Sequence, residues 1–329
     1  MKTIDEQLQE IEPFLIDVRR SIHAHPEKGF MENRTSGIVR QVLEECGAEI
    51  KSEIAQTGVT GLIRGGQPGP VIGLRLDMDA IAVTDEKTVC YKSSVDGLSH
   101  ACGHDVHTAV GLGLAKIIAM NRANVSGAVK LIFQPAEEVP FEHTLKAFDR
   151  YREAPAGRRG AAMAVAAGVL AEPDVDMLLG FHCWPELQSG NIGYQSGASM
   201  AGTGNFHLEI TGSGGHAATP HLTVDPIVIS AQVIGALQTL ASRRIKPGTP
   251  FVLTIGTIKG GVRRSVIANS VDMTGTVRSN DEDMLQEFIP AEMERLINGI
   301  TQASGAAYTF NYAVDVPPVI NNDALLQVT

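Results

Sequence analysis

VIGLRLDMD, at residues 71–79, is an apolar run that ends in two aspartates. The apolar part has the length and composition of a strand that is buried in a sheet. Two later segments have the same form, because VKLIF (129–133) precedes QPAEE and MLLGF (177–181) precedes a histidine. A helical pattern separates each pair of neighbouring strands, first over 106–119 and then over 160–170. Apolar strands that alternate with helices predict an α/β fold around a mixed, largely parallel sheet.

A different pattern of strands and helices begins after this region. Strands and helices then follow the order β-α-β-β-α-β, which is typical of a ferredoxin-like α+β domain. The expected elements lie at 206–210, 225–240, 251–258, 271–277, 283–300 and 308–314. The stretch 189–204 is rich in Gly, Ser and Ala and is the expected hinge. The sequence therefore predicts a first domain over 1–201 and a smaller second domain over 202–316.

Composition excludes several classes of protein. The 329 residues contain 27 Lys and Arg against 37 Asp and Glu, a net charge of −10, which argues against nucleic-acid or polybasic membrane-surface binding. No apolar run reaches the roughly 18 residues that a membrane helix needs. Four scattered cysteines are too few for a disulfide scaffold, so a reducing cytoplasm is the expected location.

Ionisable residues gather where the three apolar strands end. Asp77 and Asp79 follow the first strand, Glu137 and Glu138 follow the second, and His182 follows the third. In open α/β sheets the functional site lies beyond the carboxyl ends of the strands. An adjacent Glu pair is usually a solvated loop charge. After a buried strand, however, one carboxylate can bind a metal while the other accepts a proton.

The segment HACGHDVH, at residues 100–107, contains three histidines, a cysteine and an aspartate. Thiolate, imidazole and carboxylate are ligands suited to zinc and its first-row neighbours. Gly103 lets the backbone turn so that Cys102 and His104 can converge. The alternative is a buried thiol beside histidines that cap a helix. The acidic and imidazole strand ends nearby favour the metal site.

A glycine-rich segment, GSGGHAATPH at 212–221, matches a dinucleotide-binding pattern, but Pro220 interrupts the required helix and no acid follows at the ribose-binding distance. His216 and His221 in this segment could equally be surface histidines of a loop. Arg278 ends an expected strand, where a surface ion pair is the simpler interpretation.

Taken together, these motifs resemble the aminoacylase branch of the co-catalytic metallopeptidases, which includes hippurate hydrolases, indole-acetyl-amino-acid hydrolases and N-acetyldiaminopimelate deacetylases. The matching stretches include RRSIHAHPEKGFMENRT (19–35), LRLDMDAIAV (74–83), HACGHDVHTA (100–109), FQPAEE (133–138), GFHCWP (180–185) and GGHAATPH (214–221). The resemblance implies a zinc-peptidase-like catalytic domain with an inserted lid or dimerisation domain. It also implies metal-dependent cleavage of N-acyl amino acids, two divalent ions (Mn, Zn, Co or Ni) and a homodimer formed through the lid.

The resemblance also implies roles for single residues. The metal ligands would be Cys102, His104, Glu138 and His182. Glu137 would be the general base that activates water, and the aspartates that orient the ligands would be Asp77, Asp79 and Asp105. In the lid, His216 would donate to the developing oxyanion, and Arg278 and His221 would contact the substrate.

Two departures from the family pattern bear on this expectation. Ser265 occupies the position where relatives commonly carry an asparagine. Relatives also return from the lid to the catalytic domain for several dozen residues that carry a last histidine ligand, whereas here 317–329 would only begin that return and no histidine follows His221. The alternative hypothesis is therefore a truncated or non-catalytic homologue that binds metal weakly or serves as an association module.

Overall fold

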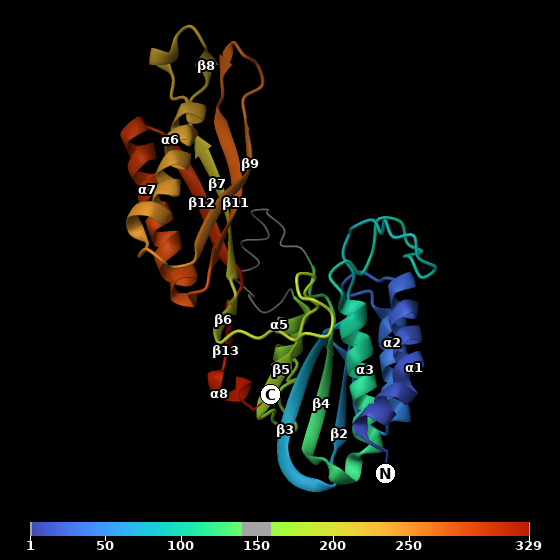
Figure 1. Ribbon diagram of the computed structural model, residues 1–329. Coiled ribbons are helices and arrows are strands. Elements are labelled where there is room, and N and C mark those ends of the chain that lie inside the picture. The colour runs from blue at the N-terminus through green and yellow to red at the C-terminus, as the bar shows by residue number, and fades with distance from the viewer. Residues whose placement is uncertain (1, 140–158, 329) are drawn as a thin grey trace. The chain divides into compact units, whose positions relative to one another are not determined.

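The computed structural model describes residues 2–139 and 159–328, which form two compact units (Figure 1). The first unit comprises 2–139 and 159–188, and the second comprises 189–328. The chain passes from one unit to the other between Gln188 and Ser189, whereas the sequence analysis placed the domain boundary after residue 201. The stretch expected to be a hinge thus belongs to the second unit.

The first unit is built on a five-stranded sheet with the order β1-β2-β4-β3-β5. Its strands are β1 (Glu49–Ile54), β2 (Gly58–Arg64), β3 (Gln67–Asp77), β4 (Ser126–Gln134) and β5 (Met177–Gly180). The three strands predicted from sequence are β3, β4 and β5, and β3 pairs in parallel with both neighbours. The sheet is mixed, because β1 and β2 form an antiparallel hairpin that joins β4. Neither strand of this hairpin was predicted from the sequence.

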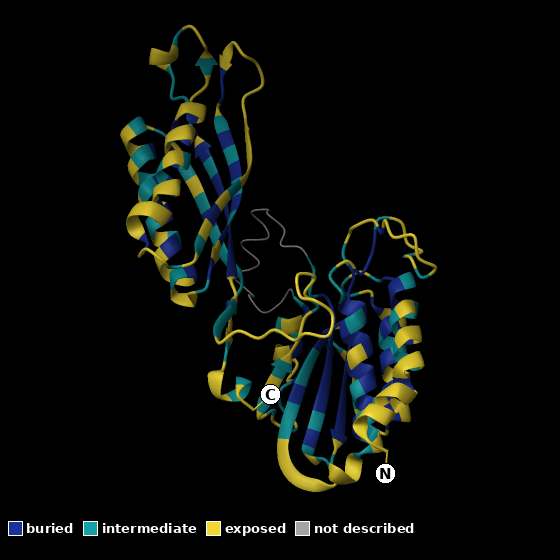
Figure 2. Ribbon diagram, in the orientation of Figure 1, coloured by how far each residue is buried: buried dark blue, intermediate teal, exposed yellow. Residues whose placement is uncertain are grey.

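Helices cover both faces of this sheet. Those on one face are α1 (Ile4–Ala24), α2 (Asn33–Glu45) and α3 (His104–Met120), and α5 (Gly160–Ala166) lies against β4 on the other (Figure 1). The alternation along β4 explains this division, because Leu131 and Phe133 pack among the first three helices while Ile132 packs against Ala164 of α5. Figure 2 shows the resulting band of buried residues along β2 and β4.

The position of α3 follows from two glycines. Gly103 precedes the helix with φ +93°, a left-handed conformation that L-residues rarely adopt. Gly111 lies so close to β3 that a Cβ there would come within 2.2 Å of a Leu76 methyl carbon. The first helical residue, His104, is therefore held next to the carboxyl end of β3.

The second unit has the expected order of elements, with a four-stranded antiparallel sheet in the order β12-β7-β11-β9. Its main elements are β7 (Gly202–Thr211), α6 (Pro226–Thr239), β9 (Phe251–Gly260), β11 (Ser270–Ser279), α7 (Ile289–Ser304) and β12 (Ala307–Val316). Both helices pack on one face of the sheet around Phe206, Leu237 and Met293. The smaller elements are β6 (Gly197–Met200), β8 (Gly215–His216), β10 (Val266–Ile267), β13 (Val319–Asn321) and α8 (Asp323–Leu326). No helix in the described ranges is long and apolar enough to span a membrane.

Candidate metal centre

The carboxyl ends of the three parallel strands meet at one edge of the sheet. Asp77, the last residue of β3, pairs with Gln134, the last residue of β4, and Arg75 pairs with Gly180 at the end of β5. The segments that follow these strand ends carry the ionisable residues singled out in the sequence. The N-terminus of α3 lies at the same edge, so segments distant in sequence become neighbours here.

Side chains from all four segments converge on His104. Three groups of residues could each hold a metal ion. Within each group, one possible ligand atom from every residue lies within 4.8 Å of those of the other residues. His104 belongs to all three groups. The groups are Cys102, His104 and His182; His104, Glu137 and Glu138; and Asp77, His104 and His107. Cys102 Sγ lies 3.3 Å from His182 Nε2, and His104 Nε2 lies 3.9 Å from Glu138 Oε1. The structure therefore brings together all four residues predicted to bind metal.

Asp79 orients two of these residues. One of its carboxylate oxygens lies 3.2 Å from His104 Nδ1, and the other accepts a hydrogen bond of 2.8 Å from the backbone N–H of Glu138. The remaining nitrogen of His104, Nε2, is buried and has no hydrogen-bond partner among the described residues. An imidazole with one nitrogen bonded to a carboxylate and the other buried without a partner has the surroundings common to histidine ligands, so His104 is a candidate metal ligand.

Asp77 contacts a residue that the sequence analysis did not assign to the site. His107 Nδ1 donates to Asp77 Oδ1 at 2.5 Å, while His107 Nε2 accepts a hydrogen bond of 2.8 Å from the backbone N–H of Cys183. Both nitrogens of His107 are thus used, and this residue fixes the segment that carries His182. His107 was visible in the HACGHDVH cluster, but spacing alone could not separate it from the ligands.

The charges at this edge favour a cation. Burial opposes a positive charge on His104, yet its hydrogen bond to Asp79 and the nearby Cys102 and Asp77 raise the pKa of this imidazole to about 11. Burial also opposes ionisation of Asp77, but the hydrogen bond from His107 and the charge of Arg75 lower the pKa of this carboxyl to about 2. The site therefore holds more negative charge than its own side chains neutralise, which suits divalent metal ions.

Glu137 is placed beside the possible ligands. Arg75 Nη2 lies 4.0 Å from Glu137 Oε1, and Arg75 Nη1 forms a 2.6 Å ion pair with Asp77. Burial raises the pKa of the Glu137 carboxyl above its ordinary value, and the charge of Arg75 opposes this rise. Arg75 was also missed from sequence, although a charged residue two positions before Asp77 in an apolar strand is a usable signal.

Asp105 contacts α1 and not the predicted metal ligands. Its carboxylate accepts from His23 Nδ1 at 2.6 Å and pairs with Arg19 Nε at 2.9 Å, so its partners lie on α1 and are not the metal-binding residues. Although Asp105 is adjacent to His104, successive side chains of a helix point in different directions. The expectation that Asp105 orients a ligand is therefore corrected: Asp105 joins α3 to α1.

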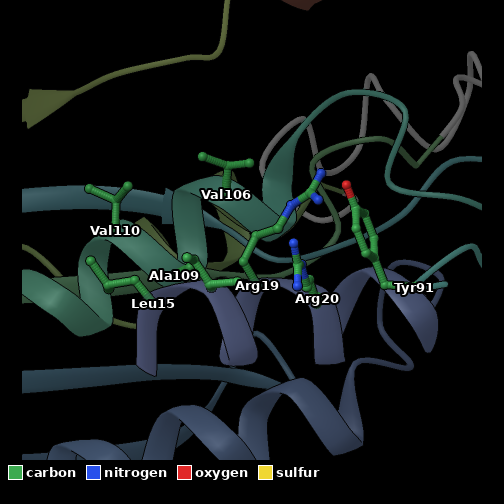
Figure 3. Close-up of a pocket in the computed structure, with 8 residues that line it drawn as sticks. Leu15, Arg19, Arg20, Tyr91, Val106, Ala109 and Val110 are labelled. Atoms are coloured by element: carbon green, nitrogen blue, oxygen red, sulfur yellow. The ribbon is translucent and has the colours of Figure 1, made fainter. Parts of the chain in front are cut away.

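A cavity of about 300 Å³ lies between α1 and α3, and its lining contains none of the predicted ligands (Figure 3). Arg19 and Arg20 lie over the ring of Tyr91 at one end, with guanidinium carbons 5.1 and 4.9 Å from the ring centre. Apolar side chains such as Leu15 and Val110 line the other end. The pairing of Arg19 with Asp105 connects this cavity to the start of α3.

The predicted lid residues lie in the second unit. His216 is an exposed residue of β8, and its Nδ1 accepts a 3.1 Å hydrogen bond from the backbone N–H of Ala218. His221 is exposed in the short helical turn Pro220–Leu222. Arg278 is an exposed residue of β11, and its Nη1 donates to Thr203 Oγ1.

This α/β sheet, with thiol, imidazole and carboxylate groups gathered at its carboxyl edge, defines a hydrolase of the metal-dependent class. The model of peptidase family M20/M25/M40 matches residues 73–329. The chain belongs to this family.

Individual relatives agree with this assignment. The chain is 39% identical to an N-acyl-L-amino acid amidohydrolase of Geobacillus stearothermophilus, over 97% of the chain and 81% of that protein. It is 36% identical to thermostable carboxypeptidase 2 of Saccharolobus solfataricus, over 98% of the chain and 78% of that protein. Among solved structures, it is similar to a Bacillus subtilis protein described as a dinuclear metal binding peptidase from the M20 family. That match has a TM-score of 0.79 and 33% identity, and it covers 97% of this chain and 78% of the other.

Proposed function

We propose that this protein is a metal-dependent amidohydrolase that cleaves the amide bond of N-acyl amino acids. The observation that carries the proposal is the convergence of Cys102, His104, Glu137, Glu138 and His182 at one edge of the sheet. Relatives described as an N-acyl-L-amino acid amidohydrolase and an N-acetylcysteine deacetylase support the substrate class, at 39% and 37% identity. Membership of the family favours an active hydrolase over a non-catalytic association module.

The residues present fit two divalent ions. Cys102, His104, Glu138 and His182 would hold them, and the Nε2 of His104, which has no hydrogen-bond partner among the described residues, would lose its proton on binding metal. A thiolate, two imidazoles and a carboxylate suit zinc, manganese, cobalt or nickel. When bound, the ions polarise the amide carbonyl and make water a stronger nucleophile near neutral pH.

Glu137 would act as the general base. A carboxylate whose pKa is raised by burial is better matched to proton transfer near neutral pH than an exposed one. It would accept a proton from the attacking water and then deliver it to the nitrogen of the departing amino acid. Asp79 would keep His104 and the Glu138 backbone in place, and Arg75 would hold Asp77 and limit the rise in the pKa of Glu137.

The second unit would supply the predicted lid residues and would form a homodimer. Because His216 Nδ1 accepts a hydrogen bond, its Nε2 carries the proton and can donate to the developing oxyanion. Arg278 and His221 would contact the carboxylate and the remainder of the substrate. Strand β9 is an edge strand with exposed Val252 and Ile258, which supports an interface between two copies. The four unpaired cysteines support a cytoplasmic location.

The test is hydrolysis of N-acetyl and N-benzoyl amino acids by the protein supplied with Mn²⁺, Zn²⁺, Co²⁺ or Ni²⁺. We expect turnover with at least one of these ions, and its loss when a chelator removes the metal. Absence of turnover with every ion, in protein shown to contain metal, would contradict the proposal.

A further inference from the structure

The segment that precedes α2 lies against both loops that carry the carboxylates of the metal centre. The backbone oxygen of Glu27 accepts from the N–H of Ala80, which follows Asp79, at 2.8 Å. Glu32, five residues later, accepts from the N–H of Ala136, which precedes Glu137, at 2.8 Å. The motif at 19–35 therefore contacts the site, although none of its residues belongs to the proposed catalytic set.

Ala136 has an unusual backbone conformation. Its φ is +53°, in the left-handed region that residues with a Cβ rarely occupy. Such a conformation persists only where the surrounding structure holds it. Because Glu137 follows directly, the conformation of Ala136 sets the direction in which the chain, and with it the Glu137–Glu138 pair, leaves β4.

Two hydrogen bonds and one close packing contact hold this conformation of Ala136. Its N–H donates to Glu32 Oε1, and its oxygen accepts a 3.1 Å hydrogen bond from the N–H of Gly160. Gly29 is packed so closely that a Cβ there would come within 2.9 Å of Ala136 Cα. Ala136 is fully buried, and so no water can replace a lost hydrogen-bond partner without rearrangement.

Glu32 is itself fixed. It is fully buried, and its second oxygen accepts a 2.5 Å hydrogen bond from Oγ1 of Thr57, which directly precedes β2. Burying a carboxylate is unfavourable unless its hydrogen bonds are satisfied, and both of its oxygens are bonded here. Glu32 thus connects the β1–β2 hairpin, the start of α2 and the segment after β4.

We propose that Glu32 is a positioning residue for the general base: its carboxylate holds Ala136 in the left-handed conformation that aims Glu137 into the metal centre. The inference rests on the proposed role of Glu137 in hydrolysis. Glu32 touches neither substrate nor metal in this account, and it acts through the backbone N–H of Ala136.

Kinetics at saturating metal separate this role from a general effect on folding. Glu32→Ala should lower kcat by about 100-fold, the loss expected when a reacting group is misplaced by about 1 Å, with KM changed by less than about threefold. Glu32→Gln keeps an oxygen for Ala136 and should stay within about tenfold of wild type. The control is Glu27→Ala, because the Glu27 carboxylate accepts from the N–H groups of Arg34 and Thr35 at the start of α2 and does not contact Ala136.

A double variant tests the route through the backbone. Glycine adopts a positive φ without the steric cost of a Cβ. Ala136→Gly in the Glu32→Ala background should therefore restore kcat by about tenfold or more. If the kcat of Glu32→Ala equals that of Glu27→Ala, or if adding Ala136→Gly fails to restore kcat, the positioning role is overturned.

Amide hydrogen exchange measures the same contact without using activity. The N–H of Ala136 should exchange much faster in Glu32→Ala than in Glu32→Gln, as followed by mass spectrometry of a peptide covering 134–139. Unchanged exchange in Glu32→Ala would overturn the inference. If wild type shows no hydrolysis at all, the proposed function fails, while the exchange measurement still decides whether Glu32 holds Ala136.

Discussion

Asp79→Asn tests the metal centre through a residue that is not itself a proposed ligand. The Asp79 carboxylate contacts His104 Nδ1 at 3.2 Å and the Glu138 N–H at 2.8 Å, and Asp79 is almost fully buried. Asparagine has nearly the same shape but only one acceptor oxygen. One of the two N–H groups would then face an amide N–H, so a buried donor loses its partner.

The size of the effect follows from that loss. An unsatisfied buried donor costs about 1–3 kcal/mol. Loss of a carboxylate that orients a ligand imidazole usually weakens metal binding by about 10- to 100-fold. Since each tenfold corresponds to about 1.4 kcal/mol, the two estimates agree. We therefore expect Asp79→Asn to bind Zn²⁺ about 10- to 100-fold more weakly than wild type.

Competition titration of the metal-free protein against a fluorescent chelator measures this affinity directly. Asp176→Asn is the matched control, because Asp176 accepts a 2.7 Å hydrogen bond from the Val71 N–H on β3, far along the strand from Asp77. Its affinity for Zn²⁺ should equal that of wild type. If the dissociation constant of Asp79→Asn lies within twofold of the wild-type value, the orientation of His104 and Glu138 by Asp79 is refuted.

Three further predictions follow from other parts of the structure. Glu137→Gln should abolish hydrolysis and leave the metal content measured by mass spectrometry unchanged, and loss of metal would identify Glu137 as a ligand instead. Arg244→Ala should lower the free energy of unfolding at pH 7, because Arg244 makes a two-point contact with Glu292 at 2.7 and 2.9 Å. Since hydrogen bonds from Arg244 and Arg295 lower the pKa of Glu292 from 4.5 to about 2, this stabilisation should be complete above pH 4.5 and should disappear as the pH falls toward 2. Urea unfolding at several pH values measures it, and a difference that grows in acid would contradict the assignment. Leu112→Ala, at a fully buried position of α3, should cost about 2–5 kcal/mol in urea unfolding, and a cost below 1 kcal/mol would show that the helix is less tightly packed than described.

The sheet of the first unit could be predicted only in part from the sequence. The strands β3, β4 and β5 are apolar runs bounded by helices, and their pattern identified them directly. The hairpin of β1 and β2 was missed, because β1 (EIKSEI) is a largely exposed edge strand and β2 contains two glycines, so neither shows a strong apolar pattern. Their pairing with β4 is a tertiary contact that local pattern does not encode.

The candidate site was predictable from sequence where residues able to bind metal follow a predicted strand or lie together in the segment HACGHDVH. Cys102, His104, Glu137, Glu138 and His182 carry chemistry that stands out in sequence, and the parallel strands bring them together. Asp105 was misjudged because adjacency to His104 says nothing about the direction of a helical side chain. His107, Arg75 and Glu32 escaped because their importance depends on partners that are distant in sequence.

The most direct test of the central claim is anomalous diffraction at the zinc edge from crystals of the protein grown with Zn²⁺. We expect two peaks at the carboxyl edge of the sheet, one about 2.3 Å from Cys102 Sγ and one about 2.0–2.1 Å from His104 Nε2. Peaks located elsewhere, with His104 Nε2 bound to no metal, would contradict the assignment of the metal centre to this edge of the sheet.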